Sequence, residues 1–182
     1  MDQSQWIESL INRFSKSLIR YATSILKDQE AAKDIVQDCL MKALSQRSQI
    51  DPNQIQGWLF RECRNRSIDV YRRRRKVEPI GEEIEESISF ADSDPLQELE
   101  TSRDFSKLRE EIAKLPSRQQ EVLFLKYNDG LSYKQIAEIM NLSPSNVGFI
   151  LFEAVKTLRE AAEKFRDAAD WKKIWGIVQS TR

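Results

Sequence analysis

Histidine is absent from this sequence: none of its 182 residues is His, and there are only two Cys and five Gly. Without an imidazole, no Ser-His or Cys-His pair can form and no histidine can act as a general base. Two cysteines are also too few for a structural zinc site, which takes four Cys or His ligands. This composition excludes His-dependent catalysis and a structural zinc site, and our prediction for the chain is no catalytic residue, no bound metal and no cofactor.

Cysteines and long apolar runs are scarce as well. Cys39 and Cys63 could form one disulfide, but both lie in stretches of helical apolar spacing, which favours buried free thiols in a reducing cytosol. No apolar run approaches the about 20 residues of a membrane span, and no signal peptide opens the chain. These features predict a cytoplasmic protein that does not insert into a membrane.

An excess of charge of either sign is missing too, with 29 Lys+Arg against 29 Asp+Glu. The charges are unevenly distributed, however. Residues 1–80 carry 15 basic and 10 acidic side chains, a balance of +5. Residues 81–104 carry one basic and nine acidic side chains (−8), and residues 105–182 carry 13 basic and 10 acidic side chains (+3). An acidic segment thus separates two basic blocks, and the zero balance does not exclude a polyanionic partner.

Outside that segment the sequence predicts helices, because Gly is scarce and apolar residues recur at spacings of three and four. One stripe comprises Trp6, Leu10, Phe14, Leu18, Tyr21 and Ile25, and a second comprises Ala31, Ile35, Cys39, Met41 and Leu44. Pro79, Gly81 and several turn formers interrupt the pattern, and Asp94-Pro95 is typical of a new helix start. We predict an all-α protein with small helical domains at 1–78 and 95–182, joined by an acidic linker at 79–94. A solvated loop without a function is the alternative for that linker.

The predicted helix from about Gln56 to Arg75 carries an unusual outward strip. Its core face contains Leu59, Cys63 and Val70, and the opposite side presents Trp58, Arg61, Asn65, Asp69 and Arg72. Arginines suit phosphates and base edges, and an indole can stack on an unpaired base. A basic helix end could simply complement the macrodipole. The five consecutive basic residues Arg72–Lys76 are more than a macrodipole requires, which favours nucleic-acid binding.

A second candidate site is a helix-turn-helix near the C-terminus. Ser132 and Gln135 have the spacing of a capping box, Asn141 suits a tight turn, and Ser143-Pro144 can begin the next helix. An ordinary helical hairpin is the alternative. The outer face of the second helix holds Ser145, Phe149, Phe152, Glu153 and Lys156. Groove-reading helices usually present Arg, Lys, Asn or Gln, so we expect weak phosphate affinity or a cover over the rings.

These motifs carry a family resemblance that extends from about Leu10 to Arg159. Ala32–Asp38, then Gly57–Arg61, Asn65 and Ile68-Asp69 up to the arginine run, resemble region two of the extracytoplasmic-function (ECF) sigma factors. Leu115–Leu123, followed by Leu131–Tyr133 and Ile136–Ile139, resemble region four. On this basis the chain is identified as a member of the ECF subgroup of the sigma-70 family of bacterial RNA polymerase sigma factors.

The resemblance implies a protein that binds core RNA polymerase and directs promoter recognition, DNA melting and transcription initiation. Region two would bind polymerase through Asp34, Gln37 and Asp38 and hold a flipped base in the loop Ser48–Gln54. The implied contacts to the minus-ten element are Asn53, Trp58, Arg61, Asn65, Asp69, Arg72, Arg73 and Arg74. The implied contacts to the minus-thirty-five element are Arg118, Tyr133, Lys134, Ser145, Asn146, Phe149 and Lys156. The acidic linker would pass through the RNA channel of polymerase, and an anti-sigma factor is an expected partner.

The sequence departs from the family pattern in three places. Gly148, Phe149 and Glu153 stand where Lys and Arg are usual in the recognition helix, and Asn141 stands where the turn commonly has Gly. About 20 residues also follow Arg159, with an apolar stripe of Phe165, Ala168, Ala169, Trp171, Ile174, Trp175 and Val178. We hypothesise that this tail packs over Phe149 and Phe152. A simple lengthening of the last helix is the alternative.

Two other classes compete with the sigma-factor interpretation. A helix-turn-helix repressor or response-regulator output domain would bind duplex DNA without binding polymerase, but the N-terminal half shows no dimerisation or receiver segment. An enzyme acting on nucleic acid would need a carboxylate-metal site, which the number of acidic residues alone does not exclude. No such cluster stands out among the residues expected to face DNA.

Overall fold

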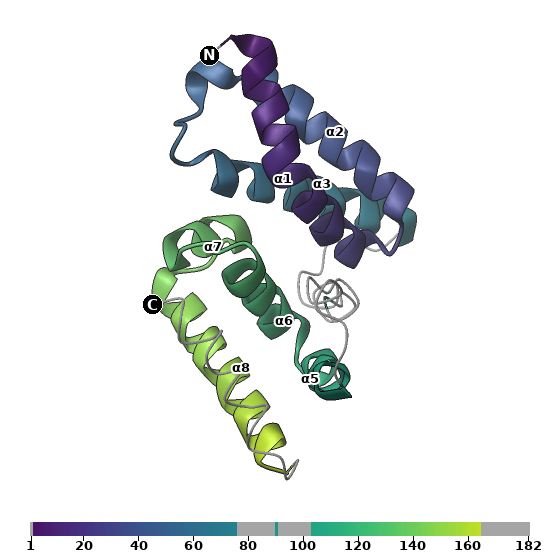
Figure 1. Ribbon diagram of the computed structural model, residues 1–182, viewed down its shortest axis with the longest axis vertical. Coiled ribbons are helices and arrows are strands. Elements are labelled where there is room, and N and C mark those ends of the chain that lie inside the picture. The colour runs from purple at the N-terminus through teal and green to yellow at the C-terminus, as the bar shows by residue number, and fades with distance from the viewer. Residues whose placement is uncertain (1, 76–89, 91–102, 165–182) are drawn as a thin grey trace. The chain divides into compact units, whose positions relative to one another are not determined.

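The computed structural model describes residues 2–75, 90 and 103–164, and all of its regular elements are helical, so the predicted all-α class is confirmed. The chain forms two compact units (Figure 1). The N-terminal unit consists of α1 (Gln3–Leu26), α2 (Gln29–Ser45), the short 3-10 turn η1 (Arg47–Gln49) and α3 (Ile55–Arg75). The C-terminal unit consists of α5 (Arg103–Lys114), α6 (Ser117–Leu123), the π-helical turn η3 (Phe124–Asn128), α7 (Tyr133–Met140) and α8 (Pro144–Lys164).

Local side-chain chemistry fixes the ends of the first two helices. Asp2 and Gln5 form a reciprocal capping box, in which the backbone N–H of Gln5 donates to Asp2 at 2.8 Å. Lys27 ends α1 in the left-handed conformation, with φ of 55°. Asp28 follows at once and caps α2 by accepting from the backbone N–H of Ala31 at 3.1 Å. The connection between α1 and α2 is therefore only two residues long.

The three helices of the N-terminal unit pack pairwise around one apolar core. Leu18, Leu59 and Phe60 are fully buried, and Tyr21 meets Phe60 edge to face with ring centroids 5.4 Å apart. Cys39 of α2 and Cys63 of α3 are buried free thiols, as expected, and form no disulfide. A hydrogen bond with Cys39 and burial raise the pKa of Cys63 well above its ordinary value, so this thiol stays protonated.

One predicted core residue of α2 is not in the core. Met41 was expected in the apolar stripe with Cys39, but its side chain is 62% exposed, and Leu44 is only half-buried. The reason is geometric, because two residues along a helix turn the side chain by about 200°. Leu40 and Ala43 fill the core in their place.

The C-terminal unit has its own core, in which α8 packs against α5 and α6. The fully buried side chains there come from α6, η3, the loop before α7, α7 itself and α8. They include Val122, Leu125, Leu131, Ile136 and Val147. The predicted helix start at Asp94-Pro95, most of the linker and the tail after Lys164 lie outside the described residues. No helix in the described ranges is both long and apolar enough for a membrane span.

The helix-turn-helix forms as the sequence predicted. Ser132 and Gln135 make the capping box, with the backbone N–H of Ser132 donating to Gln135 Oε1 at 3.0 Å and that of Gln135 donating to Ser132 Oγ at 3.3 Å. Asn141 takes the left-handed conformation, with φ of 55°. Ser143 then accepts from the backbone N–H of Asn146 at 3.1 Å, directly before Pro144 begins α8. Each turn residue thus has a defined local function.

Candidate nucleic-acid interface

The outward strip of α3 lies where the sequence placed it. Arg61, Asn65 and Asp69 follow one another at four-residue spacing and are all exposed, while Trp58 and Arg72 are half-buried at its edges. These side chains therefore share one face of a rigid helix whose opposite face is the core. Cations, an amide and an indole on one face can bind phosphates, base edges and unpaired bases.

The loop before α3 is folded rather than extended. Asp51 Oδ1 accepts from the backbone N–H of Asn53 at 2.9 Å, and the carbonyl of Asp51 accepts from the N–H of Gln54 at 2.9 Å. This turn leaves Asn53 exposed close to the start of α3. Asp51 is thus a positioning residue that the sequence analysis missed, although an Asp two residues before an Asn at a turn is a readable signal.

Trp58 is held on its face of α3 from two sides. Its backbone N–H donates to the carbonyl of Gln54 at 2.9 Å, and Lys42 Nζ of α2 lies 5.9 Å from the centroid of the indole ring. A cation at that distance is attracted to the negative face of the ring. The half-buried indole therefore has a defined neighbour while part of its surface stays open.

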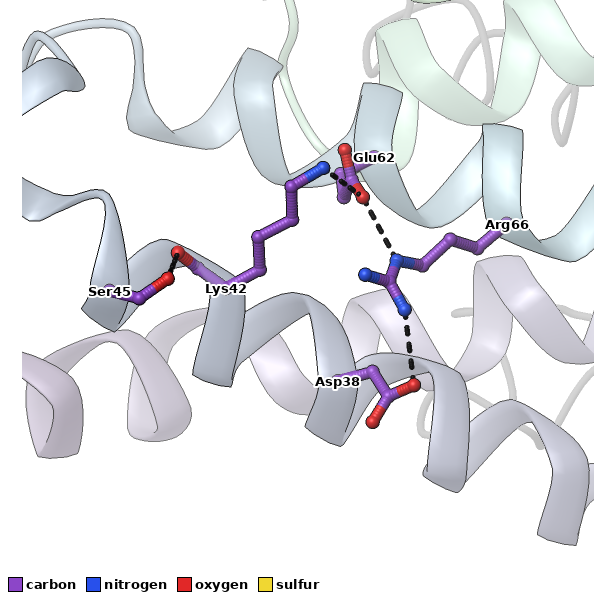
Figure 2. A network of polar contacts seen from close by, with 5 residues as sticks. All are labelled: Asp38, Lys42, Ser45, Glu62 and Arg66. Atoms are coloured by element: carbon purple, nitrogen blue, oxygen red, sulfur yellow. Dashed lines mark hydrogen bonds and ion pairs between the residues drawn. The ribbon is translucent and has the colours of Figure 1, made fainter.

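A chain of ion pairs connects α2 with α3 (Figure 2), and one of its members, Lys42, is the cation over the ring of Trp58. Lys42 Nζ and Arg66 Nε both donate to Glu62 Oε1, at 2.7 and 2.9 Å, and Arg66 Nη1 reaches Asp38 Oδ2 at 3.1 Å. Ser45 Oγ donates to the carbonyl of Lys42 at 2.9 Å. The network thus joins Asp38, implied to bind polymerase, to Lys42, which faces Trp58.

Glu62 is the central acceptor of this network, and its ionisation reflects that position. Burial alone would raise the pKa of Glu62, but hydrogen bonds from Lys42 and Arg66 hold that pKa below its ordinary value of 4.5. The same bond raises the pKa of Arg66. Glu62 and Arg66 are therefore both charged at neutral pH, and one carboxylate accepts from two cations.

Another ion pair secures the basic end of α3. Arg74 Nη1 donates to Asp28 Oδ2 at 2.9 Å, and Asp28 also caps α2. The backbone N–H of Ala31 and then Arg74 lower the pKa of Asp28. Arg74, implied to contact DNA, is therefore ion-paired at the start of α2, and both it and Arg73 beside it are exposed.

The residues implied to bind polymerase form one exposed strip on α2. Asp34, Gln37 and Asp38 lie within about one turn and are all exposed. Met41 lies next on the same strip, because seven residues are nearly two full turns from Asp34. This exposed, flexible apolar side chain thus lies beside the carboxylates that the resemblance implies for polymerase binding.

In the C-terminal unit the implied DNA contacts are all exposed. Tyr133, which is 42% exposed, lies against Gly148, and Lys126 Nζ lies 5.4 Å from the centroid of its ring. The other exposed members of the set are Arg118, Lys134, Ser145, Asn146, Phe149 and Lys156. The set is thus divided between α6, which carries Arg118, and the helix pair α7–α8.

Two aromatic rings dominate the outer face of α8. Phe149 and Phe152 are 63% and 64% exposed, so the predicted outward orientation is confirmed. The described residues therefore leave both rings largely open. The tail that was hypothesised to cover them lies outside the described residues.

Together these observations define a DNA-binding protein built from two helical units, one with a basic aromatic strip and one with a helix-turn-helix. Residues 10–77 match the family model for sigma-70 region 2, and residues 105–158 match the model for sigma-70 region 4. The chain belongs to the sigma-70 family of RNA polymerase sigma factors, in its ECF group.

Three known proteins illustrate this membership. The ECF RNA polymerase sigma factor SigM of Bacillus subtilis is 29% identical over 84% of this chain and 93% of its own length. The B. subtilis RNA polymerase sigma factor YlaC is 31% identical over 88% and 94%. The fold resembles that of the sigma factor RpoE from Bartonella quintana, crystallised with the anti-sigma factor NepR, with a TM-score of 0.59 and 24% identity over 87% of this chain and 97% of that one.

The protein is accordingly a sigma factor that directs promoter recognition. The alternative of a helix-turn-helix regulator that does not bind core polymerase is not favoured, because both sigma regions are present in their usual order. Sigma factors are DNA-recognition subunits that act on DNA in the interior of the cell.

Proposed function

We propose that this sigma factor has three binding surfaces, one for core RNA polymerase and one for each of two promoter elements. The strip Asp34, Gln37, Asp38 and Met41 of α2 binds core RNA polymerase. The strip of α3, together with Asn53 and the exposed arginines at its end, binds and melts the minus-ten element. The α7–α8 pair contacts the minus-thirty-five element. The protein itself is non-catalytic and works in the cytoplasm, where promoter DNA lies.

One observation carries the proposal for α3, namely the side-by-side exposure of Arg61, Asn65 and Asp69 with Trp58 at the edge. Melting DNA requires groups that stabilise an unstacked base as well as groups that hold phosphates. The indole supplies a stacking surface, and the amide and guanidinium supply hydrogen bonds. A helix that bound only duplex phosphates would need the arginines but not Trp58.

Run-off transcription with core polymerase tests this assignment. We expect Trp58→Ala to reduce open-complex formation by about tenfold, since stacking one base contributes about 1–3 kcal/mol. Asn65→Ala should reduce it to a similar degree, since bidentate hydrogen bonds from an amide to a base contribute about 1–3 kcal/mol. Binding to core polymerase should change by less than about threefold. Asn12→Ala is the matched control, because Asn12 is an exposed asparagine on α1. Equal loss of core binding and opening would refute a specific contribution to melting.

The aromatic face of α8 suggests how the minus-thirty-five element is contacted. Phe149 can touch a thymine methyl, whereas Ser145, Asn146 and Lys156 supply the few polar groups. Few cations on the helix imply few phosphate contacts and a shallow salt dependence for this unit. Affinity for the minus-thirty-five element should therefore fall less steeply with salt than affinity for the minus-ten element.

The expected anti-sigma factor fits the same surfaces. The Bartonella relative was crystallised with such a partner, and here the exposed Met41, Phe149 and Phe152 are available apolar contacts. We propose that an antagonist competes with polymerase for the α2 strip. The acidic linker, in turn, is proposed to follow the RNA channel of polymerase, because its carboxylates repeat the charge of RNA.

A further inference from the structure

Lys42 of α2 interacts with two residues of α3 that lie one helical turn apart. Trp58 and Glu62 are four residues apart in α3, so their side chains lie on the same side of that helix. The ammonium of Lys42 donates to Glu62 Oε1 at 2.7 Å (Figure 2) and lies over the Trp58 ring, 5.9 Å from its centroid. A single cation of α2 is thus shared between a carboxylate and an indole of α3.

Both the main chain and the side chain of Lys42 are held in place. Its backbone carbonyl accepts from Ser45 Oγ at 2.9 Å and from the backbone N–H of Gln46 at 3.0 Å, at the end of α2. The side chain of Lys42 is 36% exposed and that of Glu62 only 18%, so water partly surrounds the ion pair but does not separate it. Arg66 donates to the same oxygen of Glu62 at 2.9 Å and holds the carboxylate from its other side. The ammonium therefore has a defined position beside the indole.

This position matters for what the indole can do. A cation over the electron-rich face of a tryptophan is attracted to it and favours one orientation of the ring. An unpaired base that stacks on an indole must find the ring in a suitable orientation. A ring that is already oriented loses less conformational freedom when the base arrives, and the stacking is correspondingly stronger. The charge of Lys42 can therefore strengthen stacking on Trp58 without any contact between Lys42 and the base.

We propose that Lys42 is a positioning residue for promoter melting: held by Glu62, it fixes the orientation in which the Trp58 indole receives an unstacked base. This inference rests on the proposed function, in which Trp58 supplies the stacking surface. Lys42 acts on melting through the ring alone. Glu62 acts one step further away, through Lys42.

A double-mutant cycle in open-complex formation, measured at saturating core polymerase, tests this dependence. Lys42→Met keeps the apolar stem and removes the charge. It should reduce opening by about two- to fivefold, the range for a partly exposed cation over an aromatic ring. In the Trp58→Ala chain the same change should alter opening by less than about 1.5-fold, because the residue through which Lys42 acts is gone. Lys42→Arg, which keeps a cation at the ring, should retain most of the activity.

The C-terminal unit offers a matched control for the loss of a lysine from an ion pair. Lys114 Nζ donates to Glu111 at 2.6 Å, and the side chain of Glu111 is 17% exposed, close to the value for Glu62. Lys114→Met should leave opening unchanged. Full opening by the Lys42→Met chain would overturn the proposal. So would a loss that persists undiminished in the Trp58→Ala chain; together with a salt slope lower by about one, that loss would make Lys42 a phosphate contact.

Fluorescence quenching of Trp58 tests the position of Lys42 without transcription. With Trp6→Phe, Trp171→Phe and Trp175→Phe, Trp58 is the one tryptophan left in the sequence. A positive charge beside the ring attracts iodide, so Lys42→Met should lower quenching by iodide relative to quenching by neutral acrylamide, whereas Lys114→Met should not. An unchanged ratio would overturn the inference. If the ratio falls as expected but Trp58→Ala opens promoters as well as the native chain, the failure lies in the function proposed for Trp58 and not in the placement of Lys42.

Discussion

At the scale of single residues, Glu62 shows how one carboxylate can organise a surface. It accepts from Lys42 and Arg66 at once, and these two cations extend to Trp58 on one side and Asp38 on the other. The two cations Lys42 and Arg66 are not themselves implied to contact DNA or polymerase. They instead position Trp58 and Asp38, which are.

Replacing Glu62 by Gln should therefore weaken both stability and function. We expect Glu62→Gln to lower the free energy of unfolding by about 1–2 kcal/mol, because charged hydrogen bonds are replaced by neutral ones. Chemical denaturation at pH 7 measures this loss. An unchanged midpoint would mean that Lys42 and Arg66 find other partners at no cost.

The same variant has a predictable pH dependence. Because folding lowers the pKa of Glu62 below 4.5, the carboxylate stabilises the fold fully above that ordinary value. Its contribution is lost as pH falls through the lower folded-state pKa. The stability difference between the native chain and Glu62→Gln should therefore be constant from pH 7 to about 5 and shrink toward pH 3. A difference that grows in acid would contradict this assignment.

Another prediction at this scale concerns Met41. Because its side chain is 62% exposed, Met41→Ser should leave the thermal midpoint nearly unchanged. If the α2 strip binds polymerase, affinity for core polymerase should fall by about three- to tenfold as apolar contact is lost. Ile11→Ser is the matched control, since Ile11 is an exposed apolar residue on α1. Equal effects of the two changes would point away from α2.

At the scale of elements, the helix-turn-helix contains one glycine with no evident structural need. Gly148 lies inside α8, and a Cβ there would come within 4 Å of the Tyr133 ring alone, at ordinary contact distances of 3.5 Å to Cε2 and 3.8 Å to Cδ2. Gly148→Ala should thus stabilise the C-terminal unit by up to about 1 kcal/mol through helix propensity. Thermal unfolding measures the gain. A lower melting temperature would show that Tyr133 cannot accommodate the methyl group.

The elements also show what sequence could and could not predict. Ser132, Asn141 and Ser143 were predictable, because caps and tight turns depend on groups within a few residues of one another. The outward faces of α3 and α8 were predictable from helical periodicity. The pairing of Lys42 with Glu62 and of Arg74 with Asp28 was not, because these partners lie far apart in sequence. Met41 was misplaced because a spacing of two residues does not keep a side chain on one helical face.

At the scale of the whole molecule, the charge distribution predicts that the acidic segment competes with DNA for the basic blocks. The segment 81–104 carries nine of the 29 acidic residues, whereas the flanking blocks are basic. A tethered polyanion competes with DNA for basic surfaces without changing them. This effect depends on charge and is therefore screened by salt.

Neutralising Glu82, Glu83, Glu85 and Glu86 to Gln should therefore strengthen non-specific DNA binding by the free factor several-fold at low salt. The logarithm of affinity should also fall more steeply with the logarithm of salt concentration, because more phosphate contacts replace internal ones. A salt titration of binding to random duplex measures both. Ser87→Ala with Ser89→Ala is the uncharged control. Unchanged slopes would show that the segment does not compete with DNA.

Because Glu62 accepts from two cations at once, the residues around it constrain one another during evolution. Any single change among Asp38, Lys42, Glu62 and Arg66 removes at least one partner from a neighbouring charge, so the effects of substitutions at these positions are not additive. Descendants of this chain should therefore exchange the four residues together or keep all of them. We expect them to be inherited as a block, with drift confined to the exposed positions around them.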